Sequence, residues 1–324
     1  MALTAEQASL TLASISAGAV IDGDSVTMPH AEAPHRQYKV DSNGVGIAVY
    51  EWGPVDGPPV ALIHGGFDFA RTYDVFAGLL ASQGWRVFSW DHRNHGNSDR
   101  AALTSWAADS RDAAAVINSV SREPMPVIGH SKGGAMSLCL GDAWPHRFTR
   151  IVNIDGMPSR SRQPDMAEMM RTRLTSGELS GWLDHRQRAS HSERKPDTLE
   201  GLARRRAHMN PRLTHEWLCY LVTNGAELRP DGWRWKIDAM MRMGGFGPWR
   251  PEWALDSLSA LSQPFLGILG SHEEPMGWGT HAKNVAPALP RHGHLETFEA
   301  GHFIHIELPG AVASLVLDFL GSAR

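Results

Sequence analysis

The sequence predicts an α/β fold in which a mostly parallel sheet is covered by helices on both faces. Short apolar runs that are typical of buried strands alternate with helical patterns between residues 60 and 154. These runs end in glycine-rich or polar turns, and the carboxyl ends of parallel strands are where such sheets carry their ligand chemistry. With 324 residues, 42% hydrophobic content and a mean hydropathy of −0.29, the chain is long enough to bury a sheet of this kind.

The expected elements justify this fold in chain order. A hairpin opens the sheet, because residues 38–40 and 45–51 alternate in polarity around a turn at 41–44. Further strands are expected at 60–63, 85–90, 125–128, 151–154, 265–269 and 295–298, and helices at 72–83, 105–121, 134–140 and 311–320.

The segment from residue 157 to 262 has a different character. It contains charges, methionines and six tryptophans among helical patterns, and no run stands out as a strand. We therefore predict an N-terminal arm (1–36), a core in two parts (37–156 and 263–324) and an inserted helical cap (157–262). Whether the arm contributes to a homo-oligomer is left open at this stage.

Composition and charge exclude several classes of function. The net charge is −4, and no basic block extends beyond the arginine triplet 204–206, which we interpret as a solvated helix face, so a nucleic-acid partner is not expected. No apolar run approaches the length of a membrane span. The first basic residue is Arg36, so a secretory signal is not expected. Cys139 and Cys219 cannot form a disulfide framework. A cytoplasmic protein is expected.

The pentapeptide Gly-His-Ser-Lys-Gly at residues 129–133 carries the strongest chemical signal. It follows an apolar run and precedes a helical pattern, so it predicts a strand, a sharp turn and a helix. In that context Ser131 is a candidate nucleophile, because small residues two positions on either side permit the strained turn that exposes its hydroxyl. The alternative is an ordinary glycine-rich loop with a capping serine.

A serine nucleophile needs a base, and His302 is the candidate. It directly follows Gly301 after the last expected strand, where a histidine lies over the strand ends beside Ser131. Its neighbour His305 is the competing position, which we expect only to pack. No companion cluster at ligand spacing supports a metal at these histidines or at His292 and His294, so neither a metal nor a cofactor is expected.

Taken together, these motifs resemble the α/β-hydrolase superfamily, in its cap-bearing branch of serine hydrolases. The resemblance covers about residues 37–319 and rests on His-Gly-Gly at 64–66, the turn at 91–98, the pentapeptide at 129–133 and Gly-His-Phe at 301–303. It implies an eight-stranded core and hydrolysis as the default activity. Asn94 departs from the glycine usual in the family's turn, which affects turn geometry only.

The triad acid has two candidate positions. Asp155 lies 24 residues after Ser131, a separation that resembles family members whose acid follows the sixth strand. After the later strand the usual aspartate is missing, and only Glu273 or Glu274 is available. We favour Asp155, with Glu273 as the alternative acid.

The remaining site residues concern the oxyanion and the substrate. The backbone N–H of Lys132 and that of Gly66 or Phe67 are the expected oxyanion donors, and the Lys132 side chain has no expected acid–base role. Phe67, Trp235 and Trp249 are expected to line an apolar or aromatic pocket, with methionines adding adaptable surface. No basic cluster marks a phosphate or carboxylate substrate.

These residues predict a serine esterase or lactonase that acts on a small apolar or aromatic substrate through an acyl-enzyme on Ser131. The same triad also suits a carbon–carbon bond or an amide. From a different class, a ligand receptor on a hydrolase scaffold with little turnover remains an alternative, because a fold alone fixes no substrate.

Overall fold

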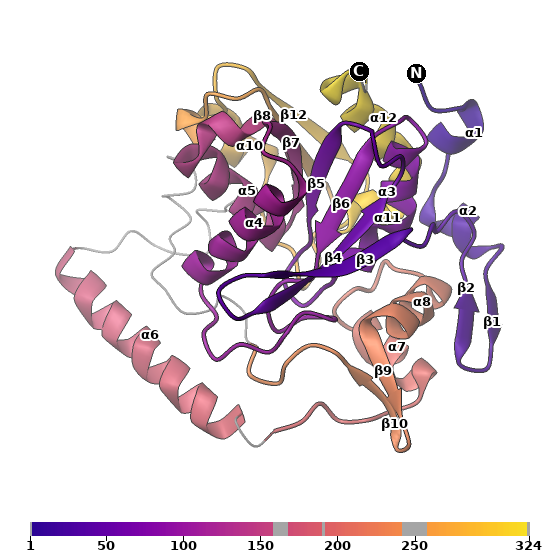
Figure 1. Ribbon diagram of the computed structural model, residues 1–324, viewed down its shortest axis with the longest axis vertical. Coiled ribbons are helices and arrows are strands. Elements are labelled where there is room, and N and C mark those ends of the chain that lie inside the picture. The colour runs from indigo at the N-terminus through magenta and orange to yellow at the C-terminus, as the bar shows by residue number, and fades with distance from the viewer. Residues whose placement is uncertain (1, 158–167, 190–191, 242–257, 323–324) are drawn as a thin grey trace.

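A sheet of eight strands runs through the molecule, and helices pack on both of its faces (Figure 1). The computed structural model describes residues 2–157, 168–189, 192–241 and 258–322. The strands of this sheet are β3 (Arg36–Asp41), β4 (Gly46–Trp52), β5 (Pro59–Ile63), β6 (Arg86–Trp90), β7 (Met125–His130), β8 (Phe148–Ile154), β11 (Phe265–Gly270) and β12 (Gly293–Phe298). Their spatial order is β12-β11-β8-β7-β5-β6-β4-β3. The pairs β3–β4 and β4–β6 are antiparallel, and the others are parallel.

The side-chain alternation of the central strands explains the two helical layers. Along β5, Val60 and Leu62 join one hydrophobic cluster, whereas Ala61 and Ile63 join the other. The first cluster includes α3 (Asp74–Ala81) and α12 (Pro309–Leu320), and the second includes α4 (Trp106–Val120) and α5 (Lys132–Ala143). Strands buried on both faces read as continuous apolar runs, which is why the sequence shows them clearly.

The segment 157–262 supplies a group of elements at one end of the sheet. In Figure 1, α7 (Leu199–Ala207), α8 (His215–Gly225) and the hairpin of β9 (Ala226–Arg229) and β10 (Gly232–Trp235) lie together, and α6 (Glu168–Ala189) lies apart from them. The expectation of a wholly helical segment is therefore wrong at β9–β10. Its two strands have four residues each, which is too short for a period of two to stand out.

The N-terminal arm is folded against both parts of the molecule. It contains the short helices α1 (Ala5–Ala8) and α2 (Leu12–Ser16) and a hairpin of β1 (Val20–Asp22) and β2 (Ser25–Thr27). Each helix begins with a threonine whose side chain accepts a backbone N–H in a capping box. The sequence predicts a helix or arm here but not this hairpin.

Short helical elements complete the described chain. They are η1 (Ala70–Tyr73), η2 (Pro145–Arg147), α10 (Ala282–Val285), η4 (Ala286–Ala288) and α11 (Ile304–Glu307). All the strands and helices expected for the core are confirmed, with ends that shift by a few residues. Among the described helices, none combines the length and the apolar character that a bilayer crossing requires.

Candidate active site

Ser131 occupies a sharp turn between β7 and α5. Its backbone has φ 52° and ψ −119°, a conformation that L-residues rarely adopt. The N–H of Ser131 donates to the carbonyl oxygen of Ile154 at 2.9 Å, which ties the turn to the end of the neighbouring strand β8. The geometry is that of a nucleophile elbow, in which the surrounding structure maintains local strain.

The two flanking glycines are required by contact as well as by conformation. A Cβ atom on Gly129 would lie 2.2 Å from the Gly133 carbonyl oxygen. A Cβ atom on Gly133 would lie 2.0 Å from the carbonyl oxygen of Ile63, at the end of β5. Side chains at these positions would therefore force strand and helix apart, which is why the pentapeptide has the pattern that the sequence shows.

His302 and Asp155 meet directly. Nδ1 of His302 lies 2.5 Å from Oδ2 of Asp155, and both side chains are almost fully buried. Asp155 follows β8 and adopts φ 45°, and its N–H donates to the Ile268 carbonyl oxygen at 2.8 Å in β11. Because β7, β8 and β11 are parallel neighbours, the residues after them reach one edge of the sheet.

The two glutamates proposed as alternative acids occupy other places. The Glu273 side chain is 74% exposed and its Oε1 lies 3.4 Å from Nε2 of His281. Glu274 is buried and accepts the backbone N–H of His302 at 2.5 Å, so it holds the main chain of the loop rather than the imidazole. Burial raises the pKa of the Glu274 carboxyl group. The structure therefore places Asp155, and neither glutamate, against the ring nitrogen of His302.

His130 connects His302 to the elbow. This histidine directly precedes Ser131, and its Nε2 donates to the carbonyl oxygen of His302 at 2.9 Å. The two rings have centroids 4.7 Å apart. On the other side the His130 ring lies 4.5 Å from the ring of His305. Burial keeps the pKa of His130 well below its usual value, so this ring is neutral at physiological pH.

Gly66 and Lys132 lie next to each other. A Cβ atom on Gly66 would be 3.9 Å from Cβ of Lys132, so the turn after β5 approaches the start of α5. The backbone N–H groups of these two residues remain the predicted oxyanion donors. The Lys132 side chain pairs with Asp109, with 2.7 Å between Nζ and Oδ2, as a local partner and not as a catalytic group.

Polar side chains of the loop after β6 form hydrogen bonds within the loop and to neighbouring elements. The buried Asp91 carboxylate accepts the N–H groups of Ala70 and Asn97, each at 2.8 Å, and the Tyr50 hydroxyl at 2.7 Å. Arg93 forms a buried two-pronged pair with Asp112, with both distances at 2.7 Å. Asn94 adopts φ 65° at the position where the family usually has glycine.

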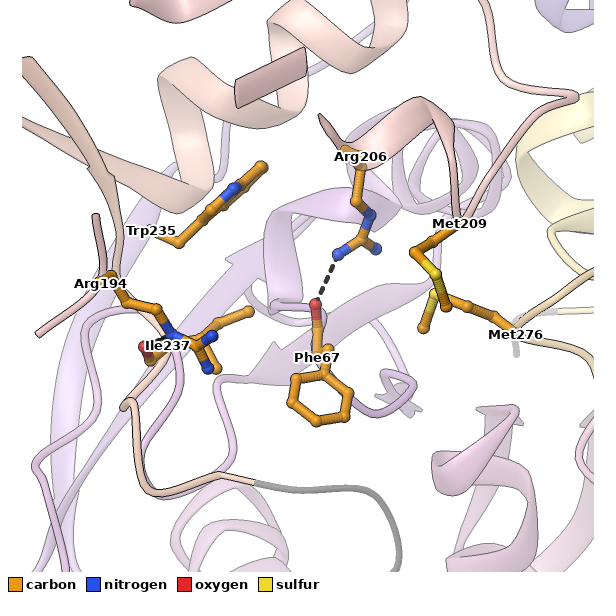
Figure 2. Close-up of a pocket in the computed structure, with 7 residues that line it drawn as sticks. All are labelled: Phe67, Arg194, Arg206, Met209, Trp235, Ile237 and Met276. Atoms are coloured by element: carbon orange, nitrogen blue, oxygen red, sulfur yellow. Dashed lines mark hydrogen bonds between the residues drawn. The ribbon is translucent and has the colours of Figure 1, made fainter. Parts of the chain in front are cut away.

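A pocket of about 350 Å³ lies beside the turn that carries Gly66. Figure 2 shows the seven lining residues around it: Phe67, Arg194, Arg206, Met209, Trp235, Ile237 and Met276. Phe67 directly follows Gly66. Met276 precedes Gly277, whose Cβ position lies 4.0 Å from Cβ of His302. Phe67 and Trp235 therefore line this pocket, whereas Trp249 lies outside the described residues.

Sequence reasoning missed four of the lining residues: Met209, Ile237 and the two arginines Arg194 and Arg206. Arg206 belongs to the triplet interpreted as a solvated helix face, and that interpretation is wrong for this residue, because its side chain is only 9% exposed. Its exposed neighbour Arg205 pairs with Asp197 instead. Helix α7 presents the two arginines to different surroundings, and sequence alone does not show which one faces a pocket.

No group of three or more histidine, cysteine, aspartate or glutamate side chains is arranged to hold a metal within the described ranges. The site brings together a hydroxyl on a strained turn and an imidazole paired with a carboxylate. Together with the eight-stranded sheet, these features define an α/β-hydrolase of the serine hydrolase class.

Comparison with known proteins agrees with this class. The chain belongs to the family described as serine aminopeptidase, S33, whose model matches residues 58–246. An sn-1-specific diacylglycerol lipase of Xenopus laevis is 31% identical over 108 residues, 33% of this chain and 35% of the relative. Monoglyceride lipase of Rattus norvegicus is 30% identical over 136 residues, 39% of this chain and 44% of the relative. These matches thus span under half the length of the relatives.

Solved structures match over more of the chain. The thioesterase domain from the curacin biosynthetic pathway has a TM-score of 0.73 at 21% identity, covering 87% of this chain and 98% of its own. An esterase of M. tuberculosis has a TM-score of 0.64 at 20% identity, covering 95% and 97%. At these identities the likeness shows the fold alone.

Proposed function

We propose that the protein hydrolyses a carboxylic ester or lactone through an acyl-enzyme on Ser131. The observation that carries the proposal is the 2.5 Å contact between His302 Nδ1 and Asp155 Oδ2. This contact leaves Nε2 of the imidazole as the basic nitrogen, on a ring that packs against the residue before Ser131. The diacylglycerol and monoglyceride lipases among the relatives, which are named for ester substrates, support the same reaction class.

In the proposed reaction, Nε2 of His302 accepts the Ser131 hydroxyl proton while Oγ attacks the substrate carbonyl carbon. The resulting oxyanion accepts hydrogen bonds from the N–H groups of Lys132 and Gly66. His302 then returns the proton to the leaving alcohol as the ester bond breaks. Water, activated by the same imidazole, releases the acid and restores Ser131. Asp155 orients the ring and stabilises its cationic form. The proposed reaction uses no cofactor.

The pocket supports an apolar or aromatic acyl or alcohol group. Phe67, Trp235, Met209, Ile237 and Met276 contribute ring, aliphatic and thioether surface. A volume of about 350 Å³ is within the range of small-molecule sites. Methionine adapts to irregular shapes, so we expect a range of chain lengths to be accepted.

The decisive experiment is Ser131→Ala. Loss of the hydroxyl removes the nucleophile, so turnover of p-nitrophenyl esters and labelling by a fluorophosphonate should both disappear. The melting temperature should change little, because the Ser131 tie to β8 is made by its backbone N–H. Ser137→Ala on the same helix is the control and should keep full labelling. Labelling that persists at another serine in the Ser131→Ala protein would contradict the proposal.

An amide is the second candidate for the scissile bond, because the family description names an aminopeptidase. The same nucleophile, base and acid cleave amides when the leaving amine is protonated by His302. Amino-acid p-nitroanilides assayed beside p-nitrophenyl esters separate the two. A kcat/KM that is higher for the anilides by a factor of ten would replace the ester proposal with the amide one.

A further inference from the structure

Arg206 reaches the pocket from α7 and uses only part of its guanidinium group. Nη1 donates to the carbonyl oxygen of Phe67 at 2.8 Å, and Nε donates to Oδ1 of Asn210 at 2.6 Å. Nη2 is buried and makes no hydrogen bond within the part of the chain that the structure describes. Figure 2 shows the guanidinium pointing toward Phe67, between Trp235 and Met209. A buried donor is thus left at a wall of the pocket, which is costly unless something binds it.

Carboxylates lie near both arginines of the pocket, but none accepts a hydrogen bond from Nη2 of Arg206 among the described residues. Nη2 of Arg206 lies 3.7 Å from Oδ1 of Asp68, too far for a hydrogen bond. Arg194, the second lining arginine, donates from Nε and Nη2 to the carbonyl oxygens of Ile237 and Asp238, each at 2.9 Å. The Asp238 carboxylate pairs with Arg100 at 2.8 Å. Asp68 thus lies near Arg206 without accepting a hydrogen bond from Nη2.

We propose that the substrate carries a carboxylate at the end distant from the scissile carbonyl, and that Nη2 of Arg206 binds it. This inference rests on the proposed ester hydrolysis. Its oxygen supplies the hydrogen-bond acceptor that Nη2 lacks. The apolar walls formed by Trp235, Ile237 and the methionines then surround the chain between the two ends. The expectation that no basic group marks a carboxylate substrate is accordingly replaced.

A carboxylate fits this wall better than a phosphate group. A phosphate monoester carries close to two negative charges at neutral pH, so Asp68 beside Nη2 would repel it more strongly than a singly charged carboxylate. Burial lowers the pKa of Arg206, and the nearby Asp68 carboxylate opposes that change.

The kinetic test compares two esters of equal chain length: the mono-p-nitrophenyl ester of adipic acid and p-nitrophenyl hexanoate. The wild-type protein should prefer the anionic ester in kcat/KM. Arg206→Gln should reduce that preference roughly 10- to 100-fold, the worth of a charge-assisted hydrogen bond. Arg205→Gln, a change on the exposed side of the same helix, is the matched control and should retain the preference.

Because Arg206 also holds Phe67, the measured quantity is the ratio between the two esters, not the activity toward one of them. Arg206→Lys keeps a cation but lacks the planar set of donors of a guanidinium group, so it should lower the ratio several-fold. This variant replaces Arg206→Gln in the test if Arg206→Gln does not fold. The inference is overturned if the wild type shows no preference for the anionic ester. An equal loss on both esters would likewise overturn it, because Arg206 would then act on Phe67 alone.

A binding experiment separates this inference from the proposed function. Adipic acid monoanilide and hexanoic acid anilide are titrated calorimetrically into the Ser131→Ala protein. Tighter binding of the anionic amide, lost in the Ser131→Ala, Arg206→Gln double variant, supports the carboxylate site even if the wild type hydrolyses neither ester. Ester hydrolysis with equal binding of the two amides would preserve the proposed function and refute the carboxylate site.

Discussion

At the residue scale, the acid of the triad is decided by a single contact. Asp155 touches Nδ1 of His302, whereas Glu274 accepts the N–H of the same residue and Glu273 is exposed. The three carboxylates that are candidate partners of His302 from the sequence thus lie in three different surroundings. The strained φ of 45° at Asp155 aims its side chain at the imidazole, and such strain is typical of functional positions.

We expect Asp155→Asn to lower kcat by about four powers of ten, because the amide can no longer hold the imidazole in the required tautomer. Glu273→Gln should leave kcat unchanged, since its side chain is exposed and pairs with His281 rather than with His302. Steady-state kinetics on one p-nitrophenyl ester gives both values. A larger loss from Glu273→Gln than from Asp155→Asn would reverse the assignment.

The elbow glycines give a second prediction at this scale. Gly133→Ala places a Cβ atom 2.0 Å from the Ile63 carbonyl oxygen, a contact with backbone that no side-chain rotation relieves. We expect the free energy of unfolding to fall by about 3 kcal/mol or more, as for severe overpacking. Urea denaturation measures this loss. Gly177→Ala in α6 is the control, because nothing lies near its Cβ position among the described residues.

At the scale of elements, the N-terminal arm joins the core to the segment 157–262. On the side of the core, the N–H of Gly310 at the start of α12 donates to the carbonyl oxygen of Leu10 in the arm at 3.2 Å. Toward the other part, Nε1 of Trp233 donates to Oδ1 of Asp24 at 2.8 Å, and the hydroxyls of Ser16 and Thr214 lie 2.6 Å apart. The arm is thus a strap across two elements that are distant in sequence.

Ile15→Ala tests the contribution of this strap. Ile15 is 1% exposed and belongs to the cluster that includes α8 and α12. Its truncation should cost about 2–4 kcal/mol of stability, the range for a large aliphatic side chain in a core. Chemical denaturation provides the value, and Ala13→Gly on the exposed face of α2 should cost about 1 kcal/mol or less. Equal effects of the two changes would show that the arm contributes no buried core.

At the scale of the whole molecule, buried histidines and carboxyl groups determine the response to acid. Burial lowers the pKa of His64, His92 and His130 well below the usual value, that of His95 to about 4 and that of His305 to about 3. Below pH ~6.5 these histidines are protonated in the unfolded chain but stay neutral in the folded protein, so stability falls as pH falls. Four carboxyl groups whose pKa burial raises oppose this: Asp68 and Asp74, each with a pKa of about 6, together with Asp91 and Glu274. The response to acid is the balance of these two sets of residues.

His305→Leu tests that balance. Both ring nitrogens of His305 are buried without a hydrogen-bond partner among the described residues, and the ring packs between Tyr73, Phe76 and His130. Between pH 6.5 and 5 the wild-type side chain should contribute a loss of about 2 kcal/mol that the variant lacks. Urea unfolding at the two pH values measures the difference. An unchanged pH slope in the variant would show that His305 does not titrate on unfolding. Ester turnover should persist, in contrast to a change at His302.

The sequence by itself determined the sheet, the elbow and the candidate nucleophile and base. Buried parallel strands are continuous apolar runs, and the strained turn tolerates only small residues around Ser131, so both leave local signals. Only the tertiary structure decided which carboxylate meets His302, that Glu274 holds its backbone, and that Arg206 faces the pocket while Arg205 does not. Those outcomes depend on where separate strands and helices come together, and contacts between residues more than a hundred positions apart, such as Arg206 with Phe67, leave no periodic trace in the chain.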